Sequence, residues 1–322
     1  MNTPDPRGLA GSAPIRTTSP EGPWTRVDTA MGDRGFALVY GLMEDWGDHG
    51  LPEDRLVRVL GPEAGRYLGI RRAETRRRFA ASRLLLKHAA GAVLDADPTD
   101  LELTRSPNGR LYLRGCDQLE VSLSHTGTFL AVGLSHVGPI GVDAEPSSRP
   151  VESTGLAEVS FTAYERAALG WLPERDRTAA VIRLWTLKEA YSKALGLGLR
   201  LPFSSFGVTI PAVSGATSRL LRADGAPADG VDWHLESHTM DAGYTVSAAV
   251  APAVFDATQR PTARVALDAS LAAAVLEAQG AHTPRPSEER DQESLRRPLD
   301  RHSMGSRHSE RVSPPRDTRR NP

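Results

Sequence analysis

The chain has 322 residues, of which 39% are hydrophobic and 25% are charged, so it can bury a sizeable core in one large or two small domains. Its formal net charge of −1 excludes a global positive field, so no nucleic-acid partner is expected. A single cysteine, Cys116, excludes an intramolecular disulfide framework and favours a reducing, cytoplasmic compartment. No apolar stretch approaches the roughly 20 residues of a transmembrane helix, so no membrane partner is expected.

Apolar periodicity and turn residues predict helices alternating with short strands. The beginning of the chain is rich in Pro, Gly, Ser and Thr and is predicted to be disordered. A long helix at 62–91, which Gly69 can interrupt, carries an apolar stripe at helical spacing. The run Ser106-Pro107-Asn108-Gly109 predicts a tight turn between two strands. We predict strands at 37–42, 101–104, 110–113, 119–125, 129–134, 140–146, 204–210, 233–238 and 244–250, and further helices at 162–170 and 177–195.

The order of helix followed by strands occurs twice, and residues 127–134 resemble residues 243–250 in pattern. We therefore predict an α+β fold of two similar halves, a pseudo-dimeric arrangement in which each half packs a helix on a small antiparallel sheet. A cleft between two such halves is a favoured place for a ligand. The predicted divisions are a disordered segment at 1–30, an N-terminal half at 31–146, a C-terminal half at 147–254 and a mostly disordered Arg/Ser/Pro-rich tail at 255–322.

The helix at 177–195 ends in an unusual set of side chains. Trp185, Glu189 and either Ser192 or Lys193 share one side at helical spacing, and Lys188 lies on an adjoining face. Gly196 follows, where a helix commonly ends with a residue of positive φ. From these residues alone, two interpretations are open: a solvated helix with a Glu–Lys pair, or one wall of a ligand site.

Three carboxylates can supply a metal site. Asp143 and Glu145 are two residues apart on a predicted strand, so both side chains leave the same face. Together with Glu189 they offer only oxygen ligands, which favours Mg²⁺, or Mn²⁺, over zinc. With Lys188 and Lys193 nearby, the set fits a metal-bridged pyrophosphate. The alternative is an acidic pair that faces solvent. Similarly, the many arginines of the helix at 62–91 either bind an anion or keep a surface helix soluble.

Three blocks of this sequence carry a resemblance. Residues 122–126 (Ser-Leu-Ser-His-Thr), 140–145 (Ile-Gly-Val-Asp-Ala-Glu) and 185–196 (the Trp-Thr-Leu-Lys-Glu helix end) resemble the signature blocks of the 4′-phosphopantetheinyl transferases in order and spacing. The long second half and residues 201–206 resemble the monomeric, surfactin-type branch of that family. The resemblance extends over residues 37–250.

The resemblance implies an activity. Coenzyme A would be the substrate that donates its 4′-phosphopantetheine arm to a serine of an apo acyl carrier protein or peptidyl carrier domain, with release of 3′,5′-ADP. It implies a magnesium-dependent, cytoplasmic, monomeric enzyme that activates carrier proteins of fatty-acid, polyketide or nonribosomal-peptide biosynthesis.

The resemblance also implies residue roles. Metal binding is implied for Asp143, Glu145 and Glu189, and catalysis for Glu189, Lys188 and Lys193. Contacts with coenzyme A are implied for Ser124, His125, Arg110, Arg71, Arg78, Lys188 and Lys193. The base that takes the serine proton is Glu189, Glu145 or a water at the metal. The sequence departs from the family pattern at Leu111, where the family has proline, and at Ala144, where it has a branched residue.

Two functions of other classes compete with this one. The first is a catalytically inactive protein that binds coenzyme A or docks a carrier; the intact set of carboxylates and lysines argues against it, because a binder needs no base. The second is an interaction protein whose tail recruits partners, and it predicts that removal of the residues after Thr283 abolishes function. We expect transfer to survive that truncation.

Overall fold

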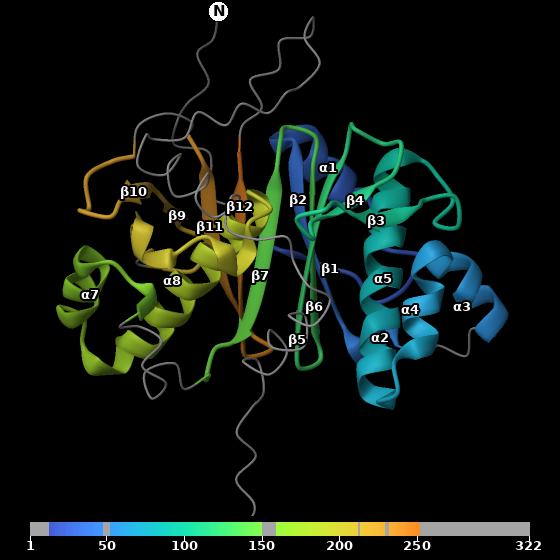
Figure 1. Cartoon of the computed structure of the whole chain (residues 1–322), viewed down its shortest axis with the longest axis horizontal. Coiled ribbons are helices and arrows are strands. Elements are labelled where there is room, and N and C mark those ends of the chain that lie inside the picture. Colours follow the sequence, from blue (N-terminus) through green and yellow to red (C-terminus); the bar gives the residue numbers. More distant parts are fainter. Residues whose placement is uncertain (1–12, 48–51, 150–158, 212, 229–231, 252–322) are drawn as a thin grey trace, which may run out of the picture. The chain divides into compact units, whose positions relative to one another are not determined.

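A computed structural model describes residues 13–47, 52–149, 159–211, 213–228 and 232–251 (Figure 1). Two four-stranded sheets lie at its centre, and a long helix packs on the outer side of each. The predicted α+β fold of two similar halves is confirmed. None of the helices in the described part of the chain is long and apolar enough to cross a membrane.

The first half contains the sheet with strand order β1-β2-β6-β5. Its strands are β1 Ile15–Arg16, β2 Phe36–Leu42, β5 Glu120–Thr126 and β6 Phe129–Ser135, with a separate hairpin of β3 Leu103–Arg105 and β4 Leu111–Leu113. Its helices are α1 Thr25–Arg34, α2 Met43–Trp46, α3 Glu53–Leu60, η1 Gly61–Glu63, α4 Ala64–Gly69 and α5 Ala73–Leu94. The predicted break near Gly69 is confirmed, because α4 ends there and α5 begins four residues later.

The second half contains the sheet with strand order β7-β12-β11-β9. Its strands are β7 Ile140–Pro146, β9 Thr217–Ser218, β11 His234–Met240 and β12 Tyr244–Val250, with a separate pair of β8 Phe206–Val208 and β10 Leu220–Arg222. Its helices are α7 Ala163–Gly170, α8 Glu174–Ala194, η3 Gly198–Arg200 and η4 Phe203–Ser205.

The two halves repeat one chain path. After β1 and α1, which have no counterpart in the second half, each half runs from an opening strand, β2 or β7, through a helix of more than 20 residues and a two-stranded pair to a final hairpin. The last strand of the hairpin pairs antiparallel with the opening strand, so β6 lies between β2 and β5 just as β12 lies between β7 and β11. The similarity of residues 127–134 and 243–250 therefore reflects two equivalent central strands.

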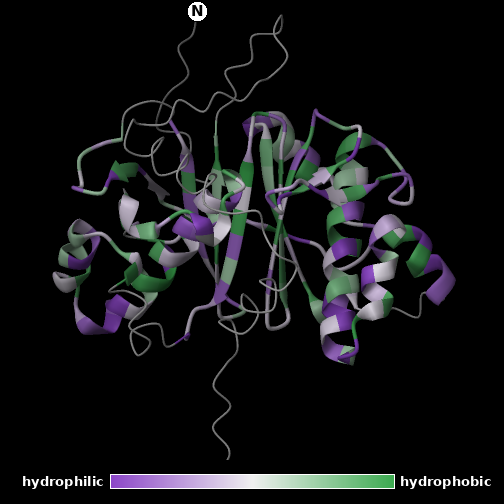
Figure 2. Ribbon diagram, in the orientation of Figure 1, coloured by the Kyte–Doolittle hydropathy of each residue, from purple (hydrophilic) through white to green (hydrophobic). Residues whose placement is uncertain are grey.

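Burial follows the period-two alternation of the strands. One apolar cluster lies between α5 and the first sheet, and another lies between α8 and the second. A third joins Leu38 and Phe129 of the first sheet to Val142 and Val246 of the second, so the two sheets pack on each other through the faces that the helices leave free. Figure 2 shows hydrophilic stretches within β7, which interrupt these otherwise hydrophobic central strands.

The structure corrects two predicted boundaries. The division between the halves is not at residue 146, because β7 pairs along its whole length with β12 and so opens the second half. The predicted disordered segment 1–30 is wrong from residue 13 onward, where β1 and α1 form. In α1 the buried residues Val27, Ala30 and Met31 follow helical spacing, a signal that the Pro- and Gly-rich surroundings obscured. The predicted tail at 255–322 lies outside the described residues.

A strand prediction also needs correction. Only residues 206–208 of the predicted strand 204–210 are extended in a pair, as β8, and the 3₁₀ turn η4 precedes them. Phe206 is buried because its ring packs against Tyr191 of α8, whereas Ile210 is only half-buried.

A buried charge cluster ties the halves together at α1 and β11. The Arg34 guanidinium lies 2.6 Å from the Glu236 carboxylate and stacks over the ring of Phe36 at 3.9 Å. His234 contacts the same carboxylate at 2.8 Å, and His238 lies 3.5 Å from it. Burial raises the pKa of the Glu236 carboxyl, but the histidine hydrogen bonds and the charge of Arg34 outweigh that effect and lower the pKa from 4.5 to about 2.

We predict that this carboxylate makes stability depend on pH. Because the folded-state pKa is the lower one, the stabilisation is present above about pH 4.5 and is lost as the pH falls through 2. Urea unfolding should show wild type more stable than Glu236→Gln by about 3 kcal/mol at neutral pH, with a smaller difference at pH 3. Glu53→Gln, at an exposed position of α3, is the matched control. A wild-type advantage over Glu236→Gln that stays constant from pH 6 to pH 3 would contradict the prediction.

Candidate functional site

Two serine hydroxyls join the halves where β5 meets the outer edge of β7. The backbone N–H of Val142 donates to Ser122 Oγ at 3.0 Å, and that of Ala144 donates to Ser124 Oγ at 3.3 Å. These N–H groups point away from β12, so the hydroxyls take the place of a second neighbouring strand, which β7 does not have within the described part of the chain. Ser124 is buried and its hydroxyl is engaged, so the predicted contact of Ser124 with coenzyme A does not fit this geometry.

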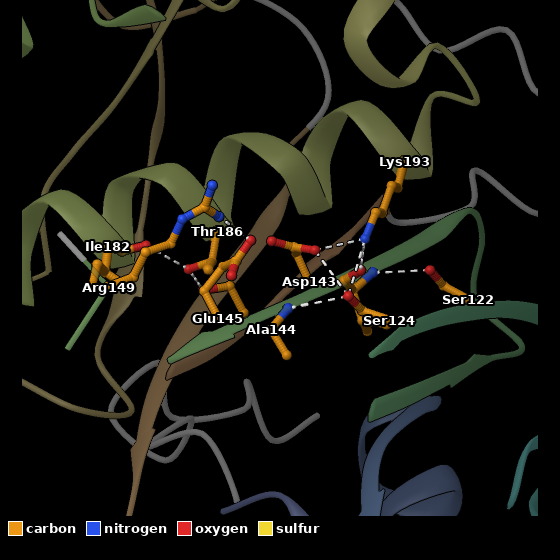
Figure 3. Close-up of polar contacts among 11 residues, drawn as sticks. Ser122, Ser124, Asp143, Ala144, Glu145, Arg149, Ile182, Thr186 and Lys193 are labelled. Carbon is orange, nitrogen blue, oxygen red and sulfur yellow. Dashed lines mark hydrogen bonds and ion pairs between the residues drawn. The ribbon is translucent and has the colours of Figure 1, made fainter. Parts of the chain in front are cut away.

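Asp143 lies between these two donors and faces α8. Its Oδ1 accepts hydrogen bonds from Ser124 Oγ at 2.9 Å and from Lys193 Nζ at 2.6 Å (Figure 3). Its Oδ2 is buried and has no hydrogen-bond partner within the described residues. An unsatisfied buried carboxylate oxygen is costly, so this atom indicates a place for a cation or a donor from a ligand.

Glu145 follows on the same face of β7 and has its own cation. Arg149, four residues further along the chain, pairs its guanidinium with the Glu145 carboxylate. The Glu145 side chain is 7% exposed and that of Arg149 is 23% exposed. In Figure 3 the Asp143 carboxylate lies between Lys193 on one side and Glu145 on the other. The sequence interpretation missed Arg149, although its spacing from Glu145 was a signal that could have found it.

Glu189 is carried by α8, which packs tightly on β7. At Gly141 an added Cβ would lie 1.9 Å from the carbonyl oxygen of Ala190, so only glycine allows this approach. Thr186 of α8 bonds Ser247, the residue that pairs with Asp143 on β12. Helical spacing then places Glu189, which is buried, between Thr186 and Lys193 along the helix.

The predicted metal ligands fit a cation only in part. The free oxygen of Asp143, with Glu145 on the same strand face, suits a hard divalent ion. Across the described residues, however, no group of three or more His, Cys, Asp or Glu side chains is arranged to hold a metal. Lys193 occupies the other oxygen of Asp143, so the structure does not assemble Asp143, Glu145 and Glu189 as one ligand set.

Lys188 does not line the site. Its side chain is fully buried, and its Nζ bonds the carbonyl oxygens of Phe203 and Phe206 at 2.6 Å each and pairs with Glu165 at 2.8 Å. Burial lowers the pKa of Lys188 to about 8, although the charge and hydrogen bond of Glu165 oppose that shift. The predicted contact of Lys188 with phosphates is not supported, because its three donors are all engaged within the protein.

The predicted coenzyme A residues of the first half lie on two sides of the site. His125 leaves β5 on the face opposite Ser124, and Arg78 of α5 reaches the carbonyl of Gly127 in the adjacent turn, at 3.5 Å. The structure thus brings Arg78 close to the strand end that carries His125. Arg71 is exposed and precedes α5.

Arg110 precedes β4 in the chain and lies in space beside Gly196, at the C-terminal end of α8. It pairs with Glu120 at 2.8 Å and follows the turn whose Asn108 packs against Gly196. Gly196 has φ +70°, as predicted for a residue that ends the helix. Its N–H bonds the carbonyl of Lys193 and the N–H of Leu197 bonds that of Ser192, which together make a Schellman motif.

Comparisons of the sequence with known proteins point to one superfamily. Residues 139–249, which run from the start of β7 into β12, match the family model of the 4′-phosphopantetheinyl transferase superfamily. The 4′-phosphopantetheinyl transferase HetI of Nostoc sp. is 31% identical over 129 residues, which are 39% of this chain and 54% of HetI. The 4′-phosphopantetheinyl transferase Sfp of Bacillus subtilis is 24% identical over 168 residues, 52% of this chain and 71% of Sfp.

A further 4′-phosphopantetheinyl transferase of Bacillus subtilis is 25% identical over 173 residues, 53% of this chain and 76% of that protein. The chain spans about half the length of the relatives from Synechocystis sp. and Nostoc sp. that it matches, at 53% and 54%. The predicted resemblance to this superfamily, including its surfactin-type members, is confirmed.

We predict that Gly196 is required for two separable reasons. Alanine at a left-handed position costs about 1–2 kcal/mol through its backbone alone, and at Gly196 its Cβ would also lie 2.4 Å from the Asn108 amide nitrogen. Gly198 has φ +54° with open space around its Cβ position, so Gly198→Ala is the matched control. Urea unfolding should therefore show a larger loss for Gly196→Ala than for Gly198→Ala. If the Gly196–Asn108 contact is the cause, the stability losses of Gly196→Ala and Gly198→Ala should become equal in an Asn108→Ala background. Equal losses in the wild-type background would refute the prediction.

Proposed function

We propose that this chain is a 4′-phosphopantetheinyl transferase that moves the phosphopantetheine arm of coenzyme A to a serine of an apo acyl or peptidyl carrier protein. The observation that carries the proposal is Asp143, a buried carboxylate with one free oxygen, held between a lysine and a second acid on the segment that matches the superfamily. A buried charged group that keeps an atom without a hydrogen-bond partner is typical of functional sites.

The proposed reaction needs positioning and charge neutralisation more than covalent help. The serine oxygen attacks the phosphorus that carries the pantetheine arm, a new P–O bond forms, and the P–O bond to the nucleotide breaks. The released 3′,5′-ADP carries away the electron pair of that bond. The serine proton goes to a carboxylate, for which Glu189 is the candidate because it lies on α8 between Thr186 and Lys193.

We assign the cation site to Asp143 and Glu145, which leave the same face of β7. Glu189 is the proposed third ligand, although the described residues do not group it with the other two. When bound, Mg²⁺ supplies neutralisation of the pyrophosphate charge. Lys193 neutralises Asp143 in the structure, and it is the lysine partly open to solvent. It can therefore contact a phosphate once another positive charge satisfies Asp143. His125, Arg78 and Arg110 are assigned to the nucleotide end of coenzyme A.

We infer a monomeric, cytoplasmic protein. Both walls of the site come from one chain, because β5 belongs to the first half and β7 and α8 to the second. A second copy is not needed to complete the site. The single cysteine supports a reducing compartment.

We predict that Glu189→Gln and Asp143→Asn each lower the rate of transfer at least about 100-fold, the scale expected for loss of a general base or of a key charge. The measurement is the mass increase of a panel of apo-carriers incubated with coenzyme A, with and without Mg²⁺. Glu174→Gln, an exposed change on the same helix, should keep the wild-type rate.

Thermal melting of each variant separates lost chemistry from lost folding. Full activity in both variants would refute the site assignment. A wild-type chain that binds coenzyme A but adds no mass to any carrier would favour the inactive binding protein instead.

A further inference from the structure

The pair of Lys188 and Glu165 is the feature of the second half that the proposed reaction leaves unused. Both side chains are 0% exposed, and Lys188 Nζ lies 2.8 Å from Glu165 Oε2. The ammonium also lies 4.5 Å from the centre of the Phe206 ring. Burying two charges is costly unless every polar atom finds a partner, so the hydrogen bonds of this pair indicate what it does.

Glu165 connects two elements that flank α8. Its Oε2 accepts the N–H of Thr162 in a capping box at the start of α7, and its Oε1 accepts the N–H of Val208 in β8. Lys188 adds the carbonyls of Phe203 and Phe206 from η4 and β8. The ion pair therefore fastens α7, η4 and β8 to one face of α8.

The geometry of a helix shows why this matters for the site. Successive residues are turned by about 100°, so Lys188 and Ala190 project on nearly opposite sides of α8. The Ala190 side is held by the close approach to Gly141 of β7. Glu189 projects between these two held faces, so contacts on both sides fix its direction.

We propose that Lys188 is a positioning residue, which together with Glu165 sets the rotation of α8 and thereby the place of the Glu189 carboxylate. This inference rests on the proposed transferase function. In this proposal Lys188 contacts only groups of the protein interior and does not contact a phosphate of coenzyme A.

The two roles differ in their kinetic signature. A lysine that touches coenzyme A contributes to its binding, so its loss raises KM. A positioning pair acts on the carboxylate used in the transition state, so its loss lowers kcat and leaves the KM for coenzyme A nearly unchanged. The positioning role also couples Lys188 to Glu165, an acid that has no assigned contact with coenzyme A.

The experiment is steady-state transfer to an apo-carrier with Lys188→Met, Glu165→Gln and the double variant. We expect each single change to lower kcat at least about tenfold with KM for coenzyme A within about twofold of wild type. The double variant should lose less than the product of the two single losses, because neither charge is left alone in the interior. Lys193→Met is the matched control: it should raise KM, and its effect should multiply with that of Glu165→Gln.

A second variant covers the case in which Lys188→Met does not fold. Glu165→Asp keeps the charge and withdraws it by one methylene, so a lowered kcat with unchanged KM supports positioning, and wild-type kinetics overturn the proposal. A raised KM in Lys188→Met, with independent effects at the two positions, also overturns it while leaving the transferase function intact. A wild-type chain without any transfer overturns the proposed function, and this inference with it.

Discussion

The serine-mediated junction between β5 and β7 is the interaction on which the site depends. Among the described residues, β7 pairs with a strand on one side only, and the N–H groups of Val142 and Ala144 would otherwise lie at an open sheet edge. Hydroxyls at Ser122 and Ser124, two residues apart on β5, match the spacing of those donors. Asp143, between them, must then lie at the meeting point of the halves. Ser124 serves twice, since the same hydroxyl that accepts from Ala144 also donates to Asp143.

Buried charge is tolerated in this fold because four of the buried acids each pair with a cation. The pairs are Asp143 with Lys193, Glu145 with Arg149, Glu165 with Lys188 and Glu236 with Arg34. The pairs differ in how many of the carboxylate oxygens have a hydrogen-bond partner. The oxygens of Glu165 are satisfied by backbone donors and the lysine, so that pair is a fixed structural unit. Asp143 keeps an oxygen without a partner within the described residues, so the same kind of pair leaves a capacity to bind.

Local patterns were predicted well where neighbours in sequence decide the structure. The capping box of Thr162 and Glu165, the positive φ at Gly196 and the turn at residues 106–109 all depend on residues within four positions of each other. The face shared by Asp143 and Glu145 follows from strand alternation. The partner of β7 could not be predicted in this way, because strand pairing across 100 residues depends on packing of whole elements.

By itself, the sequence determined the kinds of element, the repeat of two halves and the chemistry available: acids on one strand face, and a Glu–Lys helix ended by Gly196. Only the tertiary structure decided which of those groups meet. Lys188 and Lys193 look equivalent along the chain, five residues apart on one helix. Packing turns the first toward Glu165 in the interior and the second toward Asp143 at the site. The reason is physical: a helix has several faces, and the elements packed on each face determine what a side chain contacts.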